Sequence, residues 1–137
     1  MWLKNKAGKF LSQQRAETVR WPLMWCANGG NAKMGEDSYT CAKREIEEEL
    51  GLDITKLNGG LFDKRIYEED NQSYFCDSYL YDLDIDINTI NFQKEEIKKL
   101  DFFDIDTIIE MMNKGEYFVY DLDYLEYLKK YSKQNNI

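Results

Sequence analysis

Three closely spaced glutamates, Glu45, Glu48 and Glu49, are the residues of this chain best suited to chemistry. In a helix, spacings of three and four residues place their side chains on one face. Carboxylates held this close together repel each other unless a cation lies among them, and acidic clusters suit hard divalent ions such as Mg²⁺ or Mn²⁺. The adjacent Arg44 could hold a carboxylate in a fixed orientation through a bidentate contact. The spacing therefore favours a magnesium or manganese site, with Glu48 and Glu49 as exposed ligands.

A pair of glycines precedes this segment. Gly29 and Gly30 lack a Cβ, so their backbone carbonyls could approach a metal closely. The spacing from Gly30 to Gly35 is similar to the opening of a phosphate-binding P-loop, which continues with Lys and then Ser or Thr. Here Glu36 and Asp37 follow, and two negative side chains cannot bind phosphate oxygens directly. The sequence therefore argues against a P-loop.

The acidic run EIEEE alone is typical of a solvated helix face, but its wider context favours a site. Nine residues fit the pattern Gly-x5-Glu-x7-Arg-Glu-U-x-Glu-Glu-x-Gly-U, where U is aliphatic: Gly30, Glu36, Arg44, Glu45, Ile46, Glu48, Glu49, Gly51 and Leu52. At ordinary residue frequencies the chance of all nine in a chain of this size is on the order of one in ten million.

The elements that must position these residues begin with one clear helix. Asp37 or Ser38 can cap its start, and Gly51 stands where a left-handed C-terminal cap is expected. Apolar residues at spacings of three and four predict one buried stripe: Tyr39, Ala42, Ile46 and Leu50.

Strands and two further helices are expected around it. The predicted strands are Lys9–Arg15, with Met1–Lys4 as its hairpin partner, then Leu61–Tyr67 and Ser73–Leu83 joined by a turn at Asp70-Asn71, and Leu100–Phe103. The predicted helices are Asp106–Asn113 and a closing one that contains Leu122, Leu125 and Leu128. This irregular order indicates an α+β fold or a mixed α/β/α sandwich. With 137 residues and 43% hydrophobic content, we expect one domain over residues 1–137.

The composition excludes several functions. The chain has no histidine, which rules out Ser-His-Asp hydrolysis, phosphohistidine chemistry and histidine-ligated zinc. Its net charge of −8 opposes binding to a nucleic-acid duplex, including the basic RNA track that messenger-RNA decapping would need. The N-terminus lacks a secretory core, and no stretch reaches the roughly 18 apolar residues of a membrane span. Three scattered cysteines (Cys26, Cys41 and Cys76) are most simply reduced, buried thiols, so we expect a cytoplasmic protein.

The nine-residue pattern is the Nudix box, and the chain resembles the Nudix hydrolase family (MutT-like) with no departure at a defining position. The resemblance implies an α/β fold, namely an α/β/α sandwich with a mixed central sheet. In this fold the box would form a loop–helix–loop. It also implies hydrolysis of a nucleoside diphosphate linked to another moiety, with Mg²⁺ or Mn²⁺ as cofactor. Nudix domains usually have more sequence before the first strand, so we expect an unusually short first sheet edge or a start further upstream.

Roles carried over by position follow from this resemblance. Glu45, Glu48 and Glu49 would be metal ligands together with the Gly29 carbonyl, and Glu45 is a candidate for activating the attacking water. Arg44 would orient Glu45, while Gly30 and Glu36 would support the site. The family often adds an acidic residue shortly before an aromatic strand, and Glu96, six residues before Phe102, matches that layout with Glu95 as its rival. A solvated charge cluster explains this pair equally well.

Other interpretations remain open. Trp21, Trp25, Tyr67 and Phe75 could stack on a nucleobase, although packing is the more common role of such residues, as it is for the Tyr-rich tail. The WPLMW stretch is similar to a subset of bacterial Nudix proteins. A non-catalytic ligand-binding module on this fold would usually lack box glutamates, and an isopentenyl diphosphate isomerase would use histidine. The sequence predicts a small nucleotide-type diphosphate substrate and leaves both its identity and a homodimer open.

Overall fold

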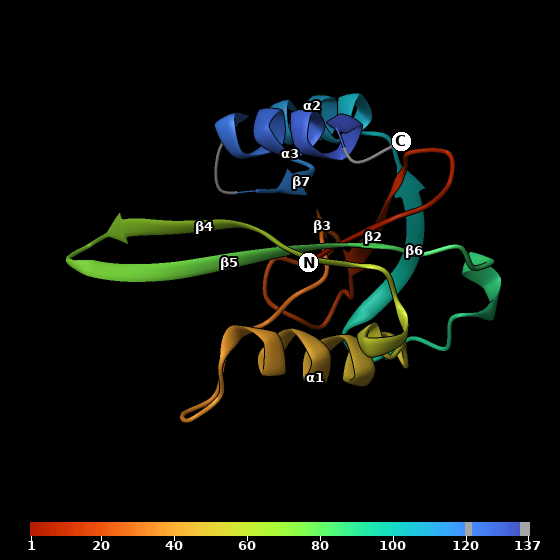
Figure 1. Cartoon of the computed structure of the whole chain (residues 1–137), viewed down its shortest axis with the longest axis horizontal. Helices are drawn as coiled ribbons and strands as arrows, with labels where there is room; N and C mark the ends of the chain where they lie inside the picture. Colours follow the sequence, from red (N-terminus) through yellow and green to blue (C-terminus); the bar gives the residue numbers. More distant parts are fainter. Residues whose placement is uncertain (120–121, 135–137) are drawn as a thin grey trace.

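A mixed β-sheet forms the middle layer of the molecule, as seen in a computed structural model that describes residues 1–119 and 122–134 (Figure 1). Its seven described strands are β1 (Trp2–Lys4), β2 (Phe10–Arg15), β3 (Trp25–Cys26), β4 (Gly59–Glu69), β5 (Gln72–Asp82), β6 (Ile97–Phe103) and β7 (Tyr117–Phe118). The helices are α1 (Ser38–Leu50), α2 (Ile105–Asn113) and α3 (Leu122–Gln134), with short 3₁₀ turns at Ile54–Lys56 and Ile87–Thr89. None of these described helices has the length and apolar character needed to cross a bilayer.

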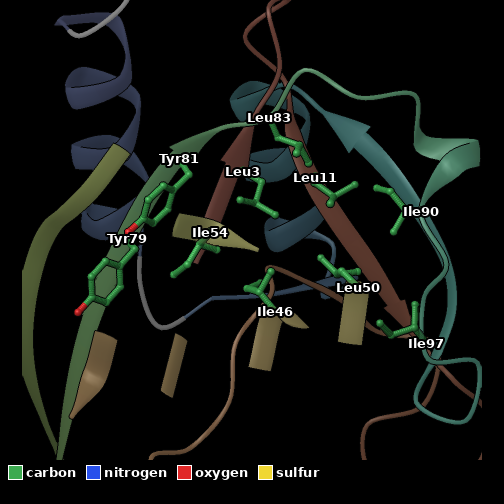
Figure 2. Packing of buried hydrophobic residues seen from close by; sticks show 10 residues of the cluster. All are labelled: Leu3, Leu11, Ile46, Leu50, Ile54, Tyr79, Tyr81, Leu83, Ile90 and Ile97. Carbon is green, nitrogen blue, oxygen red and sulfur yellow. The ribbon is translucent and has the colours of Figure 1, made fainter. Parts of the chain in front are cut away.

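Helices cover both faces of the sheet. Helix α1 lies on one side and α2 and α3 lie on the other (Figure 1). Each interface has its own apolar core. The α1 side is filled by residues such as Leu11, Ile46 and Leu50 (Figure 2), and the α2–α3 side by residues such as Phe10, Leu125 and Leu128. The α/β/α sandwich with a mixed sheet that the resemblance implies is confirmed.

The sheet forks at β2. Strand β6 pairs along one edge of β2 from Phe10 to Arg15, so β1 and β3 share the other edge. Strand β1 leads on to β5 and β4, whereas β3 leads on to β7. In the gap between the branches, the Asn28 Nδ2 donates to the Leu11 carbonyl over 3.4 Å. Residues of both branches line the space between them.

Helix α1 starts and ends where the sequence predicts. The Asp37 side chain accepts from the Thr40 N–H at 2.7 Å, and Gly51 adopts the left-handed conformation with φ of 67°. The prediction that Tyr39 belongs to the buried stripe is wrong, because Tyr39 is 41% exposed. It lies in the first turn of α1, at the periphery, with its ring edge-on to that of Tyr79. Cys41 and Glu49 are buried on this helix instead.

The remaining elements agree with the sequence to within a few residues. The β4–β5 hairpin turns at Asp70 and Asn71, both with positive φ, as the predicted turn requires. Strand β6 begins at Ile97, three residues earlier than expected, and the two-residue strands β3 and β7 were not predicted. A two-residue strand such as β7 carries no periodic pattern to recognise.

Candidate active site

A cleft of about 570 Å³ opens in the fork of the sheet. Trp2 of β1 and Ser78 of β5 line one wall, and Cys26 of β3 and Phe118 of β7 line the other. Three carboxylates, Glu49, Asp77 and Glu96, also line this cleft. A smaller cleft of about 370 Å³ adjoins it and shares the Gly29–Asn31 segment as a wall.

The three box glutamates of α1 differ in their surroundings. The Glu48 side chain is 52% exposed, whereas Glu49 is only 6% exposed, so the expectation of an exposed Glu49 is wrong. Glu49 lies on the helix face that packs toward the sheet, next to the buried Leu50. Its Oε2 atom has no hydrogen-bond partner within the described part of the chain. A buried carboxylate oxygen without a partner is costly, which makes it a natural ligand for a cation.

Arg44 forms hydrogen bonds with four other residues of the box. Its Nε and Nη2 donate to the two oxygens of Glu36 at 2.8 and 3.0 Å, the bidentate contact expected of a guanidinium. Its Nη1 donates to Glu45 Oε1 at 2.9 Å and to Glu48 Oε2 at 3.2 Å, and its Nη2 reaches the Asn31 carbonyl. These contacts lower the pKa of Glu36 to about 2, mainly through the Arg44 hydrogen bonds. Glu36 therefore stays charged and fixes Arg44, which in turn orients Glu45.

Burial raises the pKa of Glu49 to about 8, with further contributions from the negative charges of Glu45 and Glu96. The Met1 amino group, which donates to the Asn28 carbonyl at 2.6 Å, opposes this shift in the pKa of Glu49. The end of the cleft thus combines crowded negative charge with poor solvation. A divalent cation would relieve both.

Gly30 packs directly against Glu45. A Cβ built at Gly30 would collide with the Glu45 carboxylate, with both carboxylate oxygens 2.5–2.6 Å away. The same atom built at Gly29 would meet only the Met1 nitrogen at 3.9 Å, an ordinary contact. The Glu45 carboxylate therefore occupies space that a side chain at position 30 would fill.

The two acidic candidates outside the box, Glu95 and Glu96, differ in position. Glu96 lines the larger cleft and its charge acts on Glu49, whereas Glu95 is absent from that lining. A turn places Glu96 there: its N–H donates to the Gln93 carbonyl, while the Gln93 N–H donates to the Glu49 carbonyl. Among the residues the structure describes, no three Cys, Asp or Glu side chains already converge into a metal cage. Arg44 draws Glu45 and Glu48 toward itself in this arrangement.

Several lining residues were not predicted from the sequence. Asn28 is 1% exposed, and its Oδ1 lacks a partner among the described residues. On the opposite wall, the Trp2 indole N–H donates to the Tyr124 hydroxyl, which donates to Ser78 Oγ, both over 2.7 Å. These residues come from distant parts of the chain, so no local pattern could have grouped them.

The cysteines and exposed aromatics only partly match expectation. Cys41 is buried, but Cys26 and Cys76 are half-buried, and all three thiols are free. Trp25 packs edge-on against Phe103, and Tyr117 and Tyr124 join the α2–α3 core, while Tyr120 lies outside the described residues. Trp21 and Phe75 are 57% and 80% exposed and do not pack in the core.

Comparisons with known proteins agree with this geometry. The family model for the NUDIX domain matches residues 1–122. Uncharacterized Nudix hydrolases of Listeria monocytogenes and Listeria innocua are 30% and 27% identical over 118 residues, which is 85% of this chain and 68% of each relative.

Solved structures share the fold at low identity. DR0079 from Deinococcus radiodurans superposes with a TM-score of 0.75 at 20% identity, covering 91% of this chain and 77% of that one. An Ap4A hydrolase of C. elegans gives 0.66 at 19% identity over 96% and 92% of the two chains. A MutT protein from Methanosarcina mazei gives 0.66 at 17% over 98% and 90%. With the family model over most of its length, and with Gly30 and Glu49 of the box lining the cleft, this chain belongs to the Nudix hydrolase family.

Proposed function

We propose that this protein is a Mg²⁺- or Mn²⁺-dependent pyrophosphohydrolase that cleaves a nucleoside diphosphate linked to another moiety. The observation that carries the proposal is Glu49, a buried carboxylate with an unpartnered oxygen at the end of a cleft, one helical turn from Glu45. A substrate carrying several phosphates would be repelled by this end of the cleft unless a cation lay between them.

The residues present suit a hard divalent cation. The donors at this end are carboxylate and carbonyl oxygens, which magnesium and manganese prefer. Glu45, Glu48, Glu49 and the Gly29 carbonyl would hold the ion, with Glu96 as a further acidic group across the cleft. When bound, such an ion lowers the pKa of a ligated water and neutralises phosphoryl oxygens.

The protein's own contribution is orientation and proton transfer. Arg44 engages Oε1 of Glu45, so Oε2 is the atom that we assign to accept a proton from the attacking water. Glu36 keeps Arg44 in place through two hydrogen bonds. With no histidine in the chain, a carboxylate is the available general base.

The cleft suits a small nucleotide-type substrate. A volume of about 570 Å³ falls within the range of ligand pockets, and the adjoining cleft offers room for a second moiety. Similar structures include an Ap4A hydrolase and a dihydroneopterin triphosphate pyrophosphohydrolase. These neighbours support the reaction class for this chain, and a cytosolic location would fit the substrates.

The test is a hydrolysis screen with Mg²⁺ and Mn²⁺ over nucleoside triphosphates, ADP-ribose, nucleotide sugars, dinucleoside polyphosphates and dinucleotide coenzymes. We expect turnover of at least one class, abolished by EDTA. Glu48→Gln and Glu49→Gln should lower that turnover by orders of magnitude without loss of fold.

Glu47→Gln is the matched control, because Glu47 is exposed on the same helix but points away from the cleft-lining face. It should keep full activity. Equal losses in Glu47→Gln and Glu49→Gln, or EDTA-resistant turnover, would contradict the proposal.

A further inference from the structure

The β4–β5 hairpin extends well beyond the rest of the sheet (Figure 1). Strand β1 pairs with β5 only at Leu80, Tyr81 and Asp82, whereas β4 and β5 pair with each other as far as Glu69 and Gln72. The outer half of the hairpin is therefore a two-stranded ribbon in the described structure. Such a ribbon is marginally stable in water by itself, and additional strands stabilise it.

The outer edge of this ribbon is open. Strand β4 ends the sheet among the described strands, and its eleven residues offer backbone groups to a further strand. The other edge of the hairpin, on β5, faces the larger cleft through Cys76, Asp77 and Ser78. Strand addition is therefore possible on β4 without obstructing the cleft.

One face of the ribbon is apolar and uncovered. Ile66 is 61% exposed, and its direct cross-strand neighbour Phe75 is 80% exposed. The residues on either side of Ile66 on this face are charged and exposed: Lys64, whose Nζ lies 4.0 Å from Asp77 Oδ2 of β5, precedes it, and Glu68 follows it. Along the strand, this face therefore presents a positive, an apolar and a negative side chain in turn.

The opposite face is covered by the chain itself. The Arg65 guanidinium lies over the rings of Tyr124 and Tyr127 of α3, at 5.4 and 5.9 Å from their centroids. It also pairs with Asp63 at 2.8 Å. Near Arg65 this face is therefore occupied by α3, whereas the face that carries Ile66 has the more exposed apolar side chains.

We propose that β4 pairs with β4 of a second copy of this chain, antiparallel and centred on Ile66, to form a homodimer with a continuous sheet. A two-fold axis through Ile66 sets Ile66 against Ile66 of the second copy. It also sets Lys64 opposite Glu68 twice, once on each side. The two Phe75 rings border the Ile66 pair, so the apolar surface is buried between opposite charges.

The charge order favours a second copy over an unrelated partner. The sequence Lys64, Ile66, Glu68 is complementary to itself under a two-fold axis, which an unrelated partner would not require. Each chain carries a net charge of −8, so random association is repulsive and local charge pairing must select the contact. Edge charges of this kind prevent indiscriminate strand pairing and permit one register.

Charge-reversal variants test the register by sedimentation equilibrium over about a hundredfold range of concentration. Wild type should sediment as a dimer. Glu68→Lys places Lys64 opposite a lysine, and Lys64→Glu places Glu68 opposite a glutamate, so each alone should weaken the dimer by about tenfold or more. An equimolar mixture of the two should restore dimers, because both pairs are then opposite in charge.

Leu61→Lys is the control. Leu61 is 43% exposed on the same strand but lies outside the proposed register, so this variant should remain dimeric. Circular dichroism and thermal melting establish that each variant folds. A wild type that stays monomeric throughout, a Glu68→Lys variant that dimerises like wild type, or a mixture that stays monomeric would each overturn the proposal. The readout is independent of hydrolysis.

Discussion

The substitution Gly30→Ala should lower the activity of the site while leaving the stability of the fold almost unchanged. Ordinary van der Waals contact begins at 3.4 Å, but a Cβ at Gly30 would lie 2.5–2.6 Å from the Glu45 carboxylate oxygens. The carboxylate must therefore retreat by about 1 Å, a displacement that can cost about 100-fold in rate when a catalytic group is involved. This corresponds to about 2.7 kcal/mol in the activation free energy.

The fold should tolerate the same change. The colliding atoms belong to the far end of a flexible side chain, and Gly30 does not adopt a positive φ. We expect the melting temperature to shift by less than about 4 °C, while kcat/KM on the best substrate of the hydrolysis screen falls by about 100-fold. Titration with Mn²⁺, followed by its electron paramagnetic resonance signal, should show weaker binding.

Two glycines serve as controls. A Cβ at Gly29 would make one ordinary contact and a Cβ at Gly60 would make none, and neither residue has a positive φ. Gly60→Ala should be indistinguishable from wild type, and Gly29→Ala should retain most activity because its expected contribution is a backbone carbonyl. Full activity in Gly30→Ala, or an equal loss in Gly60→Ala, would refute the reasoning.

Three further predictions concern charge, metal and hydrogen bonding. Burial raises the pKa of Glu49 from 4.5 to about 8, so between these pH values Glu49 stays protonated in the folded apoprotein but is ionised in the unfolded chain. The free energy of unfolding should therefore fall by on the order of 4 kcal/mol as the pH rises through that window. Glu49→Gln should remove this dependence, as urea unfolding in EDTA at pH 5 and pH 8 would reveal. Mg²⁺ at about 100 times its Kd should stabilise wild type by about 2.7 kcal/mol and leave Glu49→Gln almost unchanged, measured by thermal melting. Tyr124→Phe leaves the Trp2 indole without its acceptor and Ser78 without its donor, and should lower the free energy of unfolding by about 1–3 kcal/mol in urea titrations.

Local chemistry explains what could be predicted from the sequence. The Asp37 cap and the Gly51 cap act within one turn of α1, so the helix bounds follow from neighbouring residues. The turn at Asp70 and Asn71 is similarly local. The box spacing grouped Glu36, Arg44 and Glu45, and the structure brings these three side chains into contact.

Tertiary packing explains what could not be predicted. Glu48 and Glu49 are adjacent in sequence, but only the sheet beneath α1 decides that Glu49 is buried. Strand β7 exists because Tyr117 and Phe118 meet Trp25 and Cys26, about ninety residues away along the chain. The wall formed by Trp2, Tyr124 and Ser78 depends on such long-range contacts as well.

The division of the sheet at β2 has a consequence for the cleft. Its two arms join at strand β2, and Trp2 of one arm stacks on Tyr117 of the other. Residues of both arms line the cleft, whereas Glu45, Glu48 and Glu49 belong to a separate element, α1. Substitutions in either arm would thus change the shape of the cleft without altering the helix that carries these glutamates.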